Sequence, residues 1–192
     1  SFITLMLYTA FLGKPTWRAL TGINFSPPNH RFVHDILVGI SIIAVCYPLL
    51  NMVHQITGLY FDLNGVPSVE QVPVEKIRLI KGDNLLFVFT GINVVILVPI
   101  LEELLFRGYF QTWAVGTLGR FFGVLMTALI FASFHYADKQ GIRNIQIIGT
   151  LFVLSLFLGY LKERQQSLWA PIGLHVAFNS IALTALLIER FS

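Results

Sequence analysis

Long apolar runs alternate with short polar breaks along the chain, and this pattern predicts membrane-spanning helices. Most runs are close to the 20 residues that an α-helix needs to cross a bilayer. None has the strict polar–apolar alternation that marks the strands of an outer-membrane barrel. In chain order the runs are Phe32–Ile56, Leu85–Arg107 (with an extension to Val115 left open), Phe121–Ala137, Ile145–Leu161 and Leu168–Ile188.

The composition predicts the same fold class. Of the 192 residues, 55% are hydrophobic and 12% are charged, whereas a soluble domain usually carries about 25% charged residues. One small core cannot bury so much apolar surface. We therefore expect an all-α protein, a polytopic transmembrane helix bundle that is surrounded by membrane lipid and keeps its ionisable groups buried in the bundle core.

The segments outside the runs predict less. Phe2–Leu12 is apolar but too short to span, and without an initiating Met we expect a truncated start. Val74–Lys81, within the polar connection Leu59–Asn84, fits either a short amphipathic helix at the membrane surface or a solvated loop. We divide the chain into an N-terminal part, residues 1–84, and a catalytic helix core, residues 85–192.

Charge and cysteine content exclude several classes of function. The net charge is only +3 and no basic run occurs, so a nucleic-acid partner is not expected. Cys46 is the single cysteine, which excludes a disulfide framework and a thiolate metal site. Lys and Arg are balanced between alternate loops, so the positive-inside rule gives no orientation.

The first chemical signal is a charged cluster in one of the most apolar stretches. Leu85–Leu101 carries no charge, and Glu102, Glu103 and Arg107 follow it directly. Each such charge costs about 2.5–3.5 kcal/mol at the centre of a membrane span. Residues four apart share a helix face, so Glu103 and Arg107 are expected to pair as an internal strut. Glu102, rotated by about 100°, is expected to face another partner.

Other polar residues lie on separate apolar runs. His135 lies near the end of the third run, and His175 and Asn179 lie four apart on the last. Each residue alone fits a hydrogen-bonded core position. Together with Glu102 they supply a base, a second group that polarises water, and donors for an oxyanion. Pro99 removes a backbone N–H, which is expected to free the carbonyl of Val95 and to kink the helix.

One difficulty concerns depth in the membrane. If every run spans, Glu102 lies about 20 Å from the end of its helix, but His175 lies only about 10 Å from the start of its own. An offset or tilt of about 10 Å between helices is needed to bring them level. Two further functions stay open: a proton or ion pathway through the buried Glu and His, and a non-catalytic binding or immunity protein.

These motifs resemble those of the CPBP intramembrane proteases, which include the CAAX prenyl endopeptidases and the bacterial Abi group. The family motifs EExxxR, FxxxH and HxxxN read here as Glu102-Glu103-x-x-x-Arg107, Phe131-x-x-x-His135 and His175-x-x-x-Asn179. The resemblance covers about residues 85–188. It implies a membrane-embedded endopeptidase with a peptide or membrane-protein substrate, lipidated or not, cleaved after a prenylated cysteine in the prenyl endopeptidases.

The resemblance also implies roles for the motif residues. Glu102 and His135 would activate water, His175 and Asn179 would stabilise the oxyanion, and the neighbouring ion pair would support the site. Members of the family are also labelled metalloproteases, and Glu102, His135 and His175 are candidate Zn²⁺ ligands with an open position. Asn179 is a poor zinc ligand, which favours hydrolysis without a metal. A bacterial inner membrane is the favoured location, with the endoplasmic reticulum or a plastid membrane as alternatives.

Overall fold

The computed structural model describes residues 31–67, 75, 80 and 84–191. Among these residues every regular element is a helix, as predicted. The predictions for Phe2–Leu12 and for most of Val74–Lys81 lie outside the described residues. The elements are α3 (Arg31–Leu63), α5 (Asn84–Ile92), the π-helix η1 (Asn93–Leu97), α6 (Val98–Glu103), the π-helix η2 (Leu104–Phe110), α7 (Gln111–Ser133), the 3₁₀-helix η3 (Asp138–Arg143), α8 (Asn144–Gln165) and α9 (Trp169–Phe191).

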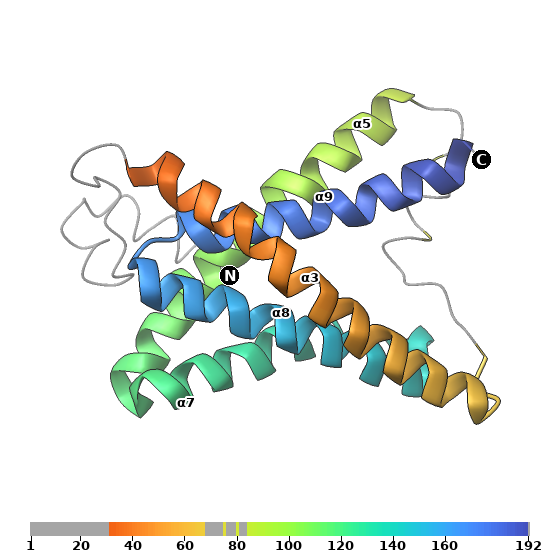
Figure 1. The fold of residues 1–192 in the computed structure, drawn as a ribbon, viewed down its shortest axis with the longest axis horizontal. Coiled ribbons are helices and arrows are strands. Elements are labelled where there is room, and N and C mark those ends of the chain that lie inside the picture. The colour runs from red at the N-terminus through yellow and green to blue at the C-terminus, as the bar shows by residue number, and fades with distance from the viewer. Residues whose placement is uncertain (1–30, 68–74, 76–79, 81–83, 192) are drawn as a thin grey trace.

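Four helical stretches in the described part of the chain are long and apolar enough to cross a membrane. The longest, Leu85–Ser133, contains 49 residues and changes direction within α7 (Figure 1). The change occurs at Gly119, whose φ of 77° lies in the left-handed region that only glycine adopts readily. The second and third apolar runs of the sequence are therefore two helical limbs that meet at Gly119, where the backbone is not helical.

The third run ends earlier than the sequence predicted. Helix α7 stops at Ser133 rather than near Ala137, and Ala137 has the extended φ of −136°. The side chain of Asn144 explains this end, because it binds both the N–H of Ala137 (3.0 Å) and the carbonyl of Ala137 (2.8 Å). His135 therefore lies in a turn after the helix, not within it.

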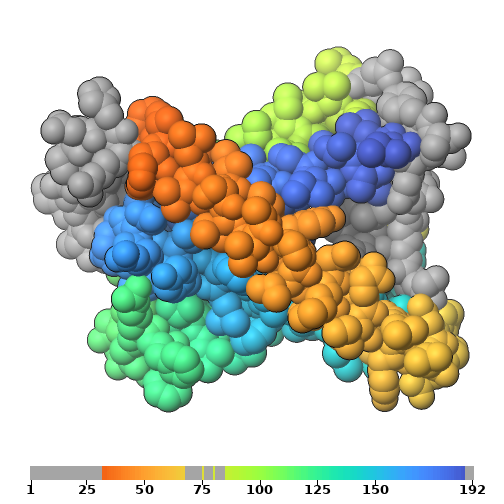
Figure 2. Space-filling view, viewed as in Figure 1, coloured from red at the N-terminus to blue at the C-terminus, as the bar shows by residue number. Residues whose placement is uncertain are grey.

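Helix α3 crosses both α8 and α9, and the crossing with α9 is very close. Figures 1 and 2 show α3 running diagonally over the face of the bundle. A Cβ atom at Gly39 would lie 2.0 Å from the carbonyl oxygen of Ala170, and one at Gly173 would lie 2.6 Å from that of Ile36. Glycine at both positions thus allows backbone contact between α3 and α9, as in other close membrane helix pairs.

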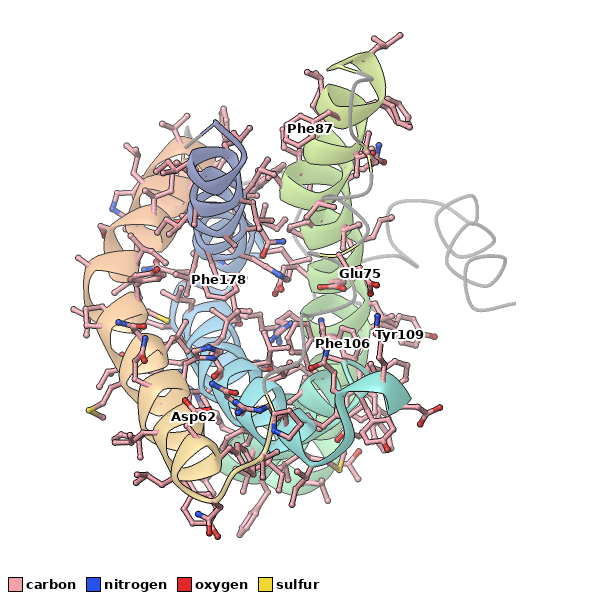
Figure 3. The ribbon with its side chains drawn as sticks, turned by 90° about the vertical axis from the view of Figure 1, so that its right-hand side faces the viewer. Asp62, Glu75, Phe87, Phe106, Tyr109 and Phe178 are labelled. Carbon is pink, nitrogen blue, oxygen red and sulfur yellow. The ribbon has the colours of Figure 1, made fainter. Side chains whose placement is uncertain are left out.

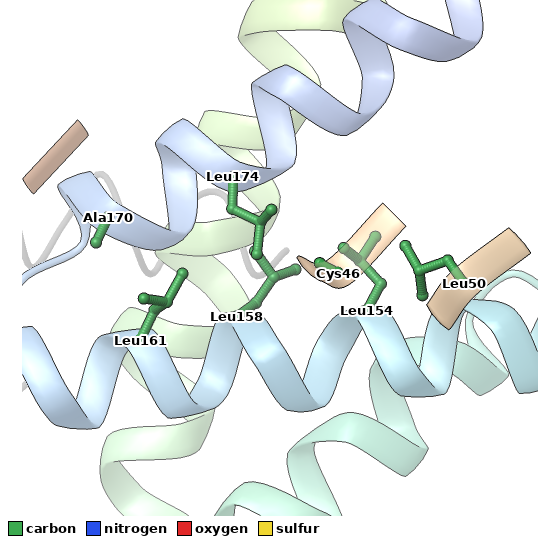
Figure 4. Packing of buried hydrophobic residues seen from close by; sticks show 7 residues of the cluster. All are labelled: Cys46, Leu50, Leu154, Leu158, Leu161, Ala170 and Leu174. Carbon is green, nitrogen blue, oxygen red and sulfur yellow. The ribbon is translucent and has the colours of Figure 1, made fainter. Parts of the chain in front are cut away.

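The hydrophobic core lies where α3, α8 and α9 meet. Its buried members, shown in Figure 4, are Cys46, Leu50, Leu154, Leu158, Leu161, Ala170 and Leu174. Phe178, labelled in Figure 3, packs against this cluster from α9. The core fixes α9 against α8 on one side, so the opposite side of α9 is free to carry the polar residues that face α6 and η1.

Candidate active site

Glu103 and Arg107 form the ion pair that their spacing predicts. Arg107 Nη1 donates to Glu103 Oε1 at 3.0 Å, and both side chains have no exposed surface. The guanidinium also lies 4.4 Å from the centre of the Phe131 ring, a cation–π contact. A buried charge needs such partners, because an uncompensated one is strongly destabilising.

His175 lies between the two adjacent carboxylates, which the sequence did not predict. Its Nδ1 is 2.8 Å from Glu103 Oε1, and its Nε2 is 3.6 Å from Glu102 Oε2. Nδ1 must carry a proton, because a carboxylate oxygen can only accept. The 100° between neighbouring helix positions turns the two carboxylates apart, and the imidazole from α9 inserts between them. Glu102 keeps 26% of its side chain exposed, whereas Glu103 is fully buried.

His135 joins the site through Phe131. The His135 ring lies 4.9 Å from the Phe131 ring, and the His175 ring lies 6.0 Å from it on centroid distances. His135 Nδ1 donates a hydrogen bond to the carbonyl oxygen of Phe131 at 2.9 Å. The remaining nitrogen, Nε2, is then the one with a free lone pair. Phe106, labelled in Figure 3, packs edge-on against Phe131 at 5.1 Å.

Asn179 binds the backbone of the bent helical path. Its Nδ2 donates to the carbonyl oxygen of Val94 at 2.9 Å. In η1 the N–H of Val98 bonds to Asn93, five residues back, so residue 99 would bond to Val94 in the same register. Pro99 has no N–H, and the amide of Asn179 takes its place. The freed carbonyl is thus that of Val94, one residue from the predicted Val95, because the π-helix shifts the register.

The sequence analysis missed the partners of the site on α8. Arg107 Nη2 donates to the buried hydroxyl of Ser155 at 2.6 Å. One turn further on, Gln111 donates to the carbonyl of Gly159 at 3.0 Å and to Glu163 at 2.9 Å. Ser155, Gly159 and Glu163 are spaced by four and share one face of α8, so a serine and a glycine on one face of the apolar run, continued by Glu163 after it, were the available signal.

A metal site is not assembled in the described part of the chain. No group of three or more His, Cys, Asp or Glu side chains there could hold a metal ion. Oε1 of Glu103 already serves both Arg107 and His175. The residues named as candidate Zn²⁺ ligands, Glu102, His135 and His175, therefore stay a prediction.

One of three comparisons with known proteins identifies a family. A family model described as type II CAAX prenyl endopeptidase Rce1-like matches residues 84–181. The matched range contains both carboxylates, both histidines and Asn179. No curated protein and no solved structure matches the chain.

Proposed function

Since the chain belongs to the Rce1-like family of type II CAAX prenyl endopeptidases, we propose that it is an intramembrane peptidase in which Glu102 activates the attacking water. The observation that carries this proposal is the distance of 3.6 Å between Glu102 Oε2 and His175 Nε2. Glu102 is also the partly exposed member of the carboxylate pair, so its side chain is not enclosed by the bundle and is the proposed contact of the attacking water.

The first step is attack of water on the peptide carbonyl. The proposed nucleophile is a water molecule held by the carboxylate of Glu102, with His135 Nε2 as its second contact. Glu102 takes a proton from this water as its oxygen bonds to the carbonyl carbon, and a tetrahedral intermediate forms. When the C–N bond breaks, the same proton passes from Glu102 to the leaving nitrogen.

The second requirement is stabilisation of the oxyanion. Asn179 has two amide hydrogens, and the bond to Val94 uses one of them. The second hydrogen of Asn179 and a protonated Nε2 of His175 are the proposed donors to the oxyanion. Glu103 supports this role because it holds His175 through Nδ1. His135, with Nδ1 bonded to the carbonyl of Phe131, is proposed to polarise the water through Nε2.

The proposed substrate is a membrane-associated peptide with a prenylated cysteine near its C-terminus. We propose that the chain, a multi-pass membrane protein, releases the tripeptide after this cysteine. The proposed mechanism uses no metal, since the chain's own groups supply the base and the donors.

A peptide assay tests the proposed function. The full chain, purified into lipid nanodiscs, is incubated with a farnesylated CAAX peptide and with the same peptide lacking the prenyl group. We expect mass spectrometry to detect the released tripeptide only from the farnesylated peptide. Equal cleavage of both peptides would contradict the proposal of a prenylated substrate. Cleavage of neither peptide would contradict the proposed peptidase activity.

A further inference from the structure

The ion pair between Arg107 and Glu103 has an unusual geometry. A guanidinium and a carboxylate often pair through two parallel hydrogen bonds. Here Arg107 Nη1 donates to Glu103 Oε1, and Arg107 Nε is buried without a hydrogen-bond partner among the described residues. The other terminal nitrogen, Nη2, donates to Ser155 at 2.6 Å. Oε2 of Glu103 is buried without a hydrogen-bond partner among the described residues.

The same oxygen of Glu103 serves two donors. Oε1 accepts from Arg107 Nη1 at 3.0 Å and from His175 Nδ1 at 2.8 Å. The contact with Ser155 uses one hydrogen of Nη2 and fixes the guanidinium against α8. The guanidinium in turn fixes the carboxylate of Glu103 in the orientation in which Oε1 faces the imidazole.

We propose that Ser155 is a positioning residue for His175, acting through Arg107 and Glu103. The expected effect on peptide cleavage rests on the proposed function, whereas the effect on the orientation of His175 does not. The chain of hydrogen bonds runs from α8, through η2 and α6, to α9. Ser155 is 1% exposed, so no solvent competes for the contact. It lies outside the three sequence motifs and touches no reacting atom.

Replacement of Ser155 by alanine removes the contact that holds Nη2 against α8. The guanidinium, whose Nε has no partner among the described residues, is then free to turn about its remaining bond to Glu103. The shared oxygen Oε1 moves with it, and the imidazole of His175 loses its fixed orientation. The ion pair itself is kept, so the folded state is not expected to weaken in proportion to the loss of activity.

The test compares Ser155→Ala with Ser155→Thr, which keeps the hydroxyl, and with Thr127→Val as the matched control. Thr127 is a buried hydroxyl on α7 that bonds only within its own helix, to Gly123 at 2.8 Å. Each full-length variant in nanodiscs is assayed with the farnesylated peptide. Each is also labelled with ¹⁵N-histidine, and the His175 resonance is assigned from its loss in His175→Asn.

Ser155→Ala is expected to lower kcat by about 10- to 100-fold with KM unchanged, the scale of a small misplacement of a catalytic group. Its His175 Nδ1 proton signal is expected to shift upfield or to exchange faster, whereas Ser155→Thr and Thr127→Val keep the wild-type signal. An unchanged His175 signal and an unchanged kcat in folded Ser155→Ala would overturn the inference. If even the wild type cleaves no peptide, the proposed function fails, and the resonance alone decides the role of Ser155.

Discussion

At the scale of the residue, the site consists of charges that are paired inside an apolar environment. His175 and Arg107 share one carboxylate oxygen of Glu103, while Glu102 faces the second nitrogen of the same imidazole. Each charge is expensive to bury alone and acceptable when paired. This explains how the chain keeps three ionisable residues within six positions of one apolar helix.

Glu103→Gln tests this pairing. The substitution preserves the shape of the side chain but leaves Arg107 buried without a counter-charge, which costs about 3–5 kcal/mol for a fully buried pair. We expect a lower free energy of unfolding, measured by SDS titration in mixed micelles, together with reduced peptide cleavage. Glu75→Gln is the control, because its pair with Lys139 is partly exposed at 35% and 54% and such pairs contribute about 0–1 kcal/mol. Equal stability of Glu103→Gln and wild type would contradict the account.

At the scale of the element, two π-helices and the close crossing of α3 and α9 bring the three sequence motifs together. The carboxylates lie in α6, a short α-helix between η1 and η2, and Asn179 holds η1 by the carbonyl of Val94. Two residues before His175 on α9, Gly173 contacts the backbone of α3. The position of His175 therefore depends on how closely α3 and α9 approach.

Gly39→Ala tests the crossing. The added Cβ would lie 2.0 Å from the carbonyl oxygen of Ala170, so α3 and α9 must separate. Overpacking of this kind costs about 1–3 kcal/mol, and we expect lower thermal stability and lower activity. Gly149→Ala on α8 is the matched control, since its Cβ would meet only Val53 Cγ1 at an ordinary 3.7 Å. A similar stability of the two variants would show that the close approach is not required.

The sequence predicted the elements better than their junctions. Apolar runs and i,i+4 spacing were enough for the helices and for the pair of Glu103 with Arg107, because both depend on local geometry. The π-register at Val94 depends on Asn179, which lies 85 residues further along the chain. The end of α7 at Ser133 depends on the side chain of Asn144, the first residue of α8. Such contacts follow from the tertiary fold, so periodicity alone could not predict them.

At the scale of the whole molecule, tilted helices bring the motifs to one depth. The sequence required an offset of about 10 Å between the helices of Glu102 and His175, within the range that tilt provides. The side chains of these two residues are 3.6 Å apart, and Figure 1 shows the helices crossing at large angles. The turn within α7 and the turn from α8 to α9 lie at the same end of the bundle, at the left of Figure 1.

Cysteine accessibility tests this arrangement. Arg120→Cys, next to the turn of α7, and Gln166→Cys, at the end of α8, should react with an impermeant maleimide from the same side of the membrane. Asp138→Cys in η3 should react from the opposite side. Native Cys46 is fully buried and is expected to remain unlabelled. If Arg120→Cys and Gln166→Cys react from opposite sides of the membrane, this arrangement of the helices in the membrane is contradicted.

The cleavage rate of Glu102→Gln tests the central claim most directly. Glutamine keeps the size of the side chain but cannot accept a proton from water, and general-base catalysis contributes about 10²- to 10⁴-fold to a rate. In nanodiscs with the farnesylated peptide, we predict at least a ~100-fold loss of single-turnover rate with unchanged thermal stability. A Glu102→Gln variant that cleaves the peptide at the wild-type rate would contradict the account.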